Sequence, residues 1–396
     1  MKLYRNLVNA VAETLKEIFT NGKYADRCIE QLFKRNPQWG SRDRRFVAES
    51  VYDIVRYYRL YAELAGNEKN FWFMTAAHLI LKGIELPDWQ EFKHFDAEKI
   101  IRHKEKLCAD PAVRESYPQW LWDLGMNETG KEKWEKEAAS LNETAKVVLR
   151  MNSIKTSSAK FEAEMKKENI LLQRSNVAMN CYVLEKRENV FRNKYFKEGW
   201  FEVQDAGSQA IGEFTDPKEG MTVIDACAGA GGKSLHLAAL MKNKGKIISM
   251  DVEQWKLDEC KKRAARANVH NIETRMIQGE QTITSLKEKA DIVLLDVPCS
   301  GTGVIKRNPD TKWKLTPGTI EKTKEIQRQI LNDYSKMVKP GGKLIYSTCS
   351  IFPSENEKQV ESFLKLRTEF QLTKQKSILP SEGYDGFYMA ELKKIN

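Results

Sequence analysis

The chain has 396 residues, of which 41% are hydrophobic and 30% charged, a balance typical of a globular protein of two to three domains. No stretch is apolar enough to span a membrane, the N-terminus lacks a signal-peptide core, and the seven cysteines show no Cys-x-x-Cys spacing. Membrane, secreted, disulfide-rich and zinc-binding classes are therefore disfavoured, and we expect a cytoplasmic, metal-free monomer. The net charge of +10 favours a polyanionic partner such as nucleic acid.

Residues 1–125 are expected to form a helical domain. Apolar residues recur at helical spacing, first at Leu7, Val8, Val11, Leu15 and Ile18. A basic stretch runs along these helices and contains Arg27, Lys34, Arg35, Arg42, Arg44, Arg45, Arg56 and Arg59. A solvated helix face accounts for such a run as readily as RNA does, but the arginine bias suits phosphate contacts.

Residues 126–200 read as a linker helix followed by a small α/β module. Strands are expected at 146–152 and 181–184, with a helix at 160–168 between them. The module could serve as an RNA platform or pack between domains.

From residue 201 to 396 strands and helices alternate, which predicts a doubly wound, mostly parallel sheet with ligands at the carboxyl ends of its strands. A further strand at 387–392 is expected to be antiparallel at the sheet edge. Pro317 suits the first turn of its helix, and Ser354 and Glu357 have capping-box spacing. The predicted strands are 222–227, 246–251, 272–278, 290–297 and 342–349, and the predicted helices 233–241, 253–267, 317–338 and 354–366.

The first of these strands leads into a glycine turn and then into the start of a helix, over residues 222–234. A P-loop would need glycine where Cys227 stands, and a dinucleotide fingerprint would need glycine in place of Ser234. The remaining pattern, Asp225-x-x-x-Gly-x-Gly-Gly, is similar to the S-adenosylmethionine turn of methyltransferases. Such a turn lets backbone approach a ligand closely at a helix N-terminus.

Acids at the next strand ends fit the adenosine part of such a ligand. Asp251 follows an apolar strand and can accept both ribose hydroxyls. Glu280 follows the next strand and could reach the adenine amino group. Asp225 is expected to orient the turn rather than touch a substrate.

Two cysteines and one more acid are predicted at the same sheet edge. Asp296 and Cys299 follow one buried strand, and Cys349 ends its neighbour. Carbon 5 of cytosine becomes nucleophilic when a thiolate adds to carbon 6, and the thiolate leaves after the carbon-5 proton is removed. A carboxyl group can hold N3 and the exocyclic amine, so Asp296 and the two cysteines fit this reaction on an unpaired or flipped base.

Three motifs together resemble the RNA (cytosine-5) methyltransferase family of RsmB/Nop/Sun type: Asp225-x-x-x-Gly-x-Gly-Gly-Lys, Asp296-x-Pro-Cys-Ser-Gly-Thr-Gly and Thr348-Cys-Ser. Leu149-Arg-Met-Asn, Val203-Gln-Asp-Ala-Gly-Ser-Gln and Ile305-x-Arg-x-Pro-Asp-x-Lys-Trp313 support the resemblance, which covers about residues 146–360. It implies a Rossmann-like class I core with a seven-stranded, mostly parallel sheet, preceded by the small α/β module and an all-α domain. The pattern around Arg42 to Arg56 resembles the NusB-like RNA-binding domain of bacterial ribosomal members.

The resemblance also implies roles for single residues. Cys349 is the nucleophile, Cys299 assists product release, and Asp296 contacts the base near the donor methyl. S-adenosylmethionine is the cofactor, and ribosomal RNA, 16S above all, is the expected substrate. The predicted cofactor site comprises Cys227, Ala228, Gly229, Ala230, Gly231, Gly232, Lys233, Asp251, Glu280 and Asp296, and the predicted RNA contacts are Arg42, Arg44, Arg45, Lys306 and Arg307.

Two positions depart from the family pattern, and three further functions compete with the one that it implies. Ala230 stands where the family usually has proline, and Glu280 where it usually has aspartate. A DNA cytosine-5 methyltransferase would use Cys299 as nucleophile and would not need Cys349. The chain could also methylate transfer RNA, or serve as a non-catalytic RNA-binding assembly factor.

Overall fold

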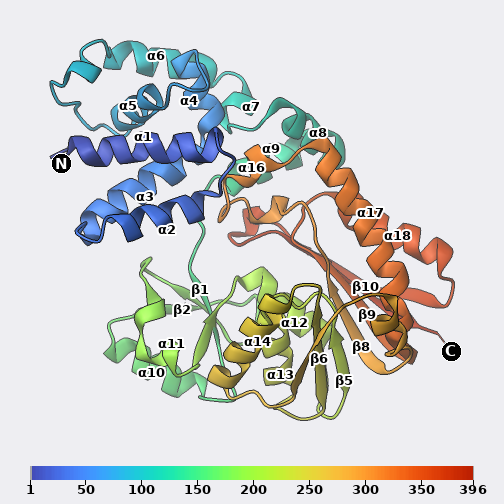
Figure 1. The fold of residues 1–396 in the computed structure, drawn as a ribbon. Helices are drawn as coiled ribbons and strands as arrows, with labels where there is room; N and C mark the ends of the chain where they lie inside the picture. The colour runs from blue at the N-terminus through green and yellow to red at the C-terminus, as the bar shows by residue number, and fades with distance from the viewer. Residues whose placement is uncertain (1, 396) are drawn as a thin grey trace. The chain divides into compact units, whose positions relative to one another are not determined.

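The computed structural model describes residues 2–395, which form two compact units (Figure 1). The first unit runs to Glu143 and takes up Ile305–Thr316 from much later in the chain. The second runs from Thr144 to Val304 and resumes at Pro317. The predicted domain boundaries at 125 and 200 stay predictions, and residues 305–316 of the predicted catalytic domain lie in the first unit.

The first unit is helical, as predicted for residues 1–125. Helix α1 buries Leu7, Val8, Val11, Leu15 and Ile18, so the apolar stripe seen in the sequence faces the core. The helices of this unit are α1 (Arg5–Phe19), α2 (Ala25–Arg35), α3 (Ser41–Arg56), α4 (Tyr58–Ala65), α5 (Phe71–Leu81), α6 (Ala97–Leu107), α7 (Pro111–Arg114), α8 (Gln119–Thr129), α9 (Lys131–Leu141) and α16 (Thr311–Lys314).

Side chains of the motif Pro309-Asp-x-Lys-Trp313 hold the segment Ile305–Thr316 in this helical unit. The Lys312 ammonium is fully buried and lies 2.7–3.1 Å from four oxygen acceptors. The Trp313 indole donates to the Val55 carbonyl at 2.7 Å, and Asp310 accepts the backbone N–H of Ala25, the first residue of α2, at 3.0 Å. The motif Pro-Asp-x-Lys-Trp is therefore a structural anchor. The oxygens around Lys312 are the carbonyls of Arg56, Glu115 and Ser116 and the Asn142 Oδ1.

The second unit begins with a small four-stranded antiparallel sheet in the order β2-β3-β1-β4. The expected strands at 146–152 and 181–184 are present, and α10 corresponds to the expected helix. The elements of this module are β1 (Val148–Met151), α10 (Ser158–Lys167), β2 (Leu172–Arg174), β3 (Cys181–Leu184), α11 (Lys194–Lys197) and β4 (Phe201–Val203).

The rest of this unit is a seven-stranded sheet in the order β10-β11-β9-β8-β5-β6-β7. Strands β9, β8, β5, β6 and β7 are parallel. Strand β11 is antiparallel to β9, as predicted for 387–392, but it lies between β9 and β10 and not at the sheet edge. The strands are β5 (Thr222–Asp225), β6 (Lys246–Asp251), β7 (Ile272–Met276), β8 (Ala290–Asp296), β9 (Val338–Thr348), β10 (Phe370–Ile378) and β11 (Phe387–Lys394). The helices are α12 (Ala206–Thr215), α13 (Gly232–Leu240), α14 (Gln254–Ala267), α15 (Glu280–Thr284), α17 (Pro317–Tyr334) and α18 (Glu357–Leu366).

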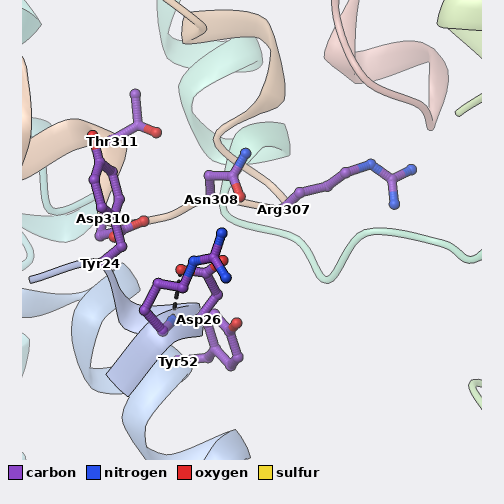
Figure 2. Close-up of a pocket in the computed structure, with 8 residues that line it drawn as sticks. Tyr24, Asp26, Tyr52, Arg307, Asn308, Asp310 and Thr311 are labelled. Atoms are coloured by element: carbon purple, nitrogen blue, oxygen red, sulfur yellow. Dashed lines mark hydrogen bonds between the residues drawn. The ribbon is translucent and has the colours of Figure 1, made fainter. Parts of the chain in front are cut away.

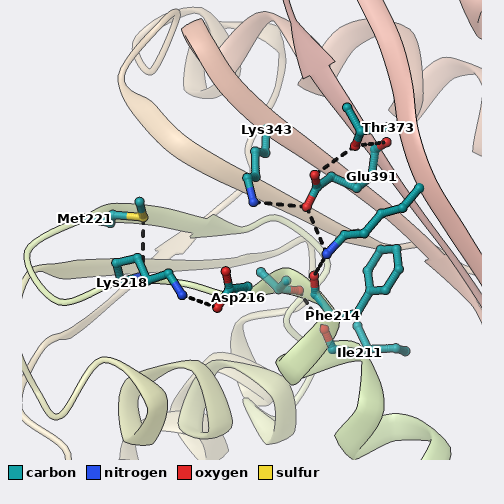
Figure 3. Close-up of polar contacts among 10 residues, drawn as sticks. Ile211, Phe214, Asp216, Lys218, Met221, Lys343, Thr373 and Glu391 are labelled. Atoms are coloured by element: carbon teal, nitrogen blue, oxygen red, sulfur yellow. Dashed lines mark hydrogen bonds and ion pairs between the residues drawn. The ribbon is translucent and has the colours of Figure 1, made fainter.

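Strand β10 was not predicted, because five consecutive residues in its middle are exposed or polar and show no apolar alternation. Its neighbour β11 carries Glu391, which is 6% exposed and lies 3.1 Å from Lys343 of β9 (Figure 3). Thr373 of β10 donates to the same carboxylate at 2.8 Å. Lys374 lies 3.3 Å from it and also donates to the Phe214 carbonyl of α12. Glu391 therefore ties three antiparallel strands and a covering helix together.

Helices α11, α12, α15 and α16 and strands β2 and β4 were also not predicted, and some predicted helices differ in their bounds. The predicted helix 354–366 begins at Glu357, with Asn356 as its N-cap, so the predicted Ser354–Glu357 capping box does not form. Helix α17 begins at Pro317 as predicted but ends at Tyr334, where a 3₁₀ turn takes over. No helix among residues 2–395 has the length and apolar character needed to cross a bilayer.

Candidate active site

The candidate site lies at the carboxyl edge of four adjacent parallel strands. Asp225, Asp251 and Asp296 are the last residues of β5, β6 and β8, and Cys349 directly follows β9. The sheet order β9-β8-β5-β6 makes these strands neighbours. The predicted convergence of Asp296, Cys299 and Cys349 beside the glycine turn is therefore present.

The glycine turn connects β5 to α13 through backbone that only glycine tolerates. Gly231 has φ +81°, and a Cβ there would lie 2.3 Å from the Cys260 sulfur of α14. The Gly229 N–H donates to Asp251 Oδ2 at 2.9 Å. The acid at the end of β6 thus fixes the turn while its other oxygen accepts the Glu253 N–H at 3.0 Å.

The small antiparallel module supports this turn from the side. The Ala230 carbonyl accepts a hydrogen bond from Arg263 at 3.0 Å, and Arg263 pairs with Glu202 of β4 at 2.9 Å. Glu202 is 4% exposed and also binds Arg266 at 2.6 Å. These contacts hold the peptide at the position where the family usually has proline. Glu202 and Arg263 were missed, because neither belongs to a motif and they meet only in the folded chain.

A cavity of about 200 Å³ opens beside the turn. The Asp225 Oδ1 atom is buried there without a hydrogen-bond partner, while Oδ2 accepts from Ser234 at 2.6 Å. Burial raises the pKa of Asp225 to about 6. A cavity with an unsatisfied acceptor, next to exposed turn backbone, fits a polar cofactor that carries donor groups. The cavity is lined by Val203, Gln204, Ser208, Asp225, Cys227, Ala228, Gly232, Lys233, Arg263 and Asp296.

Not every predicted cofactor residue lines this cavity. Gly229, Ala230 and Gly231 form the turn next to it, and Asp251 lies behind the turn. Glu280 is exposed at the start of α15. The contact of Glu280 with adenine stays a prediction.

Lys233 and Asp296 form an ion pair at the mouth of the site. The Lys233 ammonium lies 2.6 Å from Asp296 Oδ2, and Ser347 of β9 donates to Oδ1 at 3.1 Å. Burial opposes the charge of Lys233, but Asp296 outweighs it and raises the pKa of the ammonium overall. Asp296 is thereby oriented by partners from two other elements.

The two cysteines are in direct contact. The Cys299 and Cys349 sulfurs lie 3.2 Å apart, and the Cys349 N–H points to the Cys299 sulfur at 3.3 Å. The shared contact with Cys349, together with burial, raises the pKa of Cys299 well above the usual thiol value. Cys299 is therefore a neutral thiol at pH 7 and can donate its S–H to Cys349.

The predicted RNA contacts lie in the first unit, in different surroundings. Arg42 and Arg45 are exposed on α3, whereas the Arg44 guanidinium donates to the Trp39 and Pro37 carbonyls at 2.9 and 3.3 Å. Lys306 is 4% exposed and lies 3.2 Å from Glu143. We correct the prediction for Lys306, because a buried, paired ammonium does not offer its charge to a phosphate.

Arg307 lines a cavity of about 310 Å³ within the first unit (Figure 2). Arg27 lies on α2, whose N-cap is Tyr24, Tyr52 lies on α3, and Asn308 neighbours Arg307 in the inserted segment. Tyr24 is 61% exposed. Aspartates 26 and 310 and Thr311 complete the lining.

The parallel sheet, the turn and the acids at successive strand ends define an S-adenosylmethionine-dependent methyltransferase with a Rossmann-like core. Solved structures share this fold. The crystal structure of PH0851 superposes with a TM-score of 0.83 at 26% identity and covers the whole of both chains. A methyltransferase homolog protein from Pyrococcus horikoshii matches 72% of this chain and 98% of its own, with a TM-score of 0.65 at 25% identity.

The chain belongs to the family of 16S rRNA methyltransferases RsmB/F, whose model matches residues 213–393. A model for the ferredoxin-like domain of this family matches residues 117–191. The probable ribosomal RNA small subunit methyltransferase B of Synechocystis is 29% identical over 96% of this chain and 97% of its own length. The corresponding Bacillus subtilis protein is 32% identical over 72% of this chain and 67% of its own. The protein is thus an RNA methyltransferase that uses S-adenosylmethionine and acts on ribosomal RNA.

Proposed function

We propose that the protein methylates carbon 5 of a cytosine in small-subunit ribosomal RNA through a covalent adduct with Cys349. The observation that carries this proposal is the pair of thiols 3.2 Å apart beside the Lys233–Asp296 ion pair. The relatives named as small-subunit enzymes support the choice of RNA.

In the proposed reaction the Cys349 thiolate forms a bond to carbon 6 of the ring, and the electron pair of the 5,6 double bond is delocalised toward N3. Asp296, held by Lys233 and Ser347, accepts a hydrogen bond from the exocyclic amine, and in its protonated form it donates to N3 as negative charge develops there. S-adenosylmethionine, held by the turn and by the cavity beside Asp225, supplies the methyl group to carbon 5. A water molecule then accepts the carbon-5 proton, the 5,6 double bond forms again, and the Cys349 thiolate leaves carbon 6 while the Cys299 S–H donates to the departing sulfur.

The two thiols take different roles because their surroundings differ. The pKa of Cys299 is raised by its contact with Cys349 and by burial, so Cys299 keeps its proton at neutral pH. The neutral S–H of Cys299 can donate a hydrogen bond to the Cys349 sulfur, 3.2 Å away. This supports Cys349 as the nucleophile and Cys299 as the group that assists release.

Trapping with RNA that contains 5-fluorocytidine tests this assignment, because fluorine cannot leave as a cation and the adduct persists. Cys349→Ala should give no adduct. Cys299→Ala should still form one, and on unmodified RNA it should accumulate adduct that is not released. An adduct that persists in Cys349→Ala and is lost in Cys299→Ala would reverse the two roles.

We further propose that the cavity around Arg307 receives an unpaired nucleotide of the RNA. Tyrosine rings stack on bases, and Arg27 and Arg307 can hold the flanking phosphates.

Binding of deproteinised 16S rRNA measures the contribution of this cavity. Tyr24→Ala should weaken binding about tenfold, from the loss of one stacked base. Tyr24→Phe retains the ring and should bind as wild type does. Equal binding by Tyr24→Ala and wild type would exclude a stacking role, and the affinity for S-adenosylmethionine should not change in either variant.

A further inference from the structure

Two adjacent buried residues, Glu355 and Asn356, contact the loops that carry both thiols. They follow β9, Glu355 at the end of a 3₁₀ turn (Pro353–Glu355) and Asn356 as the N-cap of α18. Glu355 is fully buried and Asn356 is 3% exposed. Burying a carboxylate is costly unless each oxygen has a partner, so the partners of Glu355 indicate its purpose.

Glu355 fixes the backbone on both sides of Cys299. Its Oε1 accepts the Ser300 N–H at 2.8 Å, and its Oε2 accepts the Ser300 hydroxyl at 2.5 Å. The Gln327 amide of α17 donates to Oε1 at 3.0 Å and to the Pro298 carbonyl at 2.9 Å. The residue before Cys299 and the residue after it are therefore held by one carboxylate and the amide bound to it.

Asn356 holds both chain neighbours of Cys349 in a similar way. Its Nδ2 donates to the Ser350 carbonyl at 2.9 Å, and its Oδ1 accepts the Thr348 hydroxyl at 2.5 Å. Thr348 and Ser350 are the two neighbours of Cys349 in the chain. The hydroxyls of Ser300, Thr302 and Ser350 lie 3.1–3.3 Å from one another and join the two loops directly.

Glu355 and Asn356 are consecutive, and consecutive Cα atoms lie about 3.8 Å apart across a rigid trans peptide. This peptide therefore fixes the spacing between the contacts to the Cys299 loop and the contacts to the Cys349 loop. We propose that Glu355 and Asn356 form a clamp, defined by these two side chains, that sets the separation of the Cys299 and Cys349 sulfurs for the reaction. They are positioning residues, because they contact the loops and not the sulfurs. The proposal rests on the roles assigned above to the two thiols.

The clamp needs the hydrogen-bonding capacity of these side chains and not just their volume. Asn356→Asp places an oxygen against the Ser350 carbonyl in place of a donor, with almost no change in size. Glu355→Gln keeps an acceptor for the Ser300 N–H, and the Ser300 hydroxyl can rotate to accept from the new amide. Glu355→Ala removes the hold on Cys299 altogether.

The test combines turnover with a distance readout that needs no catalysis. Dibromobimane, a reagent that bridges two nearby thiols, should link Cys299 to Cys349 in the wild type, as mapped by peptide mass spectrometry. In Glu355→Ala and Asn356→Asp the linked fraction should fall severalfold and kcat about 10- to 100-fold, since misplacement near 1 Å costs rates of that order. The Kd for S-adenosylmethionine, measured by calorimetry, should stay within about twofold.

Glu355→Gln should restore most of the linkage and turnover, and Glu361→Ala, at an exposed glutamate of α18, should match the wild type. If Glu355→Ala no longer binds S-adenosylmethionine, Asn356→Asp decides, because it opens no cavity. Wild-type linkage and kcat in Asn356→Asp would overturn the clamp. A wrong nucleophile assignment would show instead in the 5-fluorocytidine trapping of the cysteine variants and would leave the linkage result intact.

Discussion

Each unit contains a lysine, Lys233 or Lys312, from a motif that carries the family resemblance. The two side chains have opposite surroundings. Lys233 lies 2.6 Å from the Asp296 carboxylate and its side chain keeps 13% exposure. Lys312 is fully buried and lies among three backbone carbonyls and one side-chain amide oxygen. Neutral, fixed acceptors make Lys312 part of the fold, whereas a carboxylate at a cavity makes Lys233 part of the site.

The role of a lysine within a motif depends on the group that it contacts. A lysine whose donors are all satisfied by fixed neutral oxygens has no capacity left for a substrate. A lysine paired with one carboxylate can exchange that partner or orient it toward a reactant. Substitutions of these and other charged residues should show how partners and burial set the role of a charged side chain.

The largest effect is expected from Lys312→Met. The Arg56 and Ser116 carbonyls and the Asn142 Oδ1 would lose the buried Lys312 donor, so the free energy of unfolding should fall by about 3 kcal/mol or more. Denaturant unfolding measures it. Lys93→Met, at an exposed lysine of the same unit, should change stability by less than about 0.5 kcal/mol. A loss below about 1 kcal/mol in Lys312→Met would contradict a structural role.

Lys233→Met should lower activity much more than stability. Asp296 would lose its cation, so we expect kcat on 16S rRNA to fall about 100-fold, comparable to the loss of one electrostatic contact in an active site. The free energy of unfolding should change by about 1 kcal/mol or less. If Lys233→Met unfolds as readily as Lys312→Met, the two lysines are alike and the comparison fails.

A smaller, pH-dependent effect is expected for Asp225. Its pKa is raised to about 6 by burial, so the folded state holds a proton that the unfolded state releases near pH 4. Stability from this group is present below pH 4 and is lost as the pH rises through 6. Asp225→Asn should therefore gain up to about 2–3 kcal/mol relative to wild type between pH 4 and 7, in cofactor-free protein. Parallel stability curves for the two proteins would exclude the raised pKa.

The smallest effect should distinguish the arginines of α3. Arg42→Glu with Arg45→Glu reverses two exposed charges, so RNA affinity should fall severalfold and less so at high salt, with little change in unfolding. Arg44→Ala should instead cost about 1 kcal/mol of stability, because its guanidinium holds two carbonyls. Filter binding and thermal unfolding separate these outcomes, and equal loss of stability in both variants would remove the distinction.

Much of the catalytic unit could be predicted because its signals are local. The strands at 222–225, 246–251 and 290–296 are apolar runs that each end in an acid, and parallel strands present such ends at one edge. The glycine turn is equally local, because the left-handed φ of Gly231 needs no information from elsewhere. Strand β10 escaped prediction because edge strands exposed to solvent lose the apolar pattern.

The supports of the site escaped prediction for another reason. Glu202 and Arg263 are 61 residues apart, and Ser300 and Glu355 are 55 apart, so no spacing rule connects them. Lys306 was predicted to contact RNA, but its burial beside Glu143 was decided by packing. The capping-box spacing at Ser354 is a valid local pattern, but the helix begins after Asn356. The Asn356 side chain holds the Cys349 loop.

The class of the protein follows from its residue types, because the donor turn, the strand-end acids and the two cysteines lie in contiguous motifs. Only the tertiary structure decided which charged side chains are available. It took residues 305–316 out of the catalytic unit, buried Lys312 among neutral oxygens and set Lys233 against Asp296. The physical reason is that a charge acts through its partners and its burial, and both are properties of the folded chain.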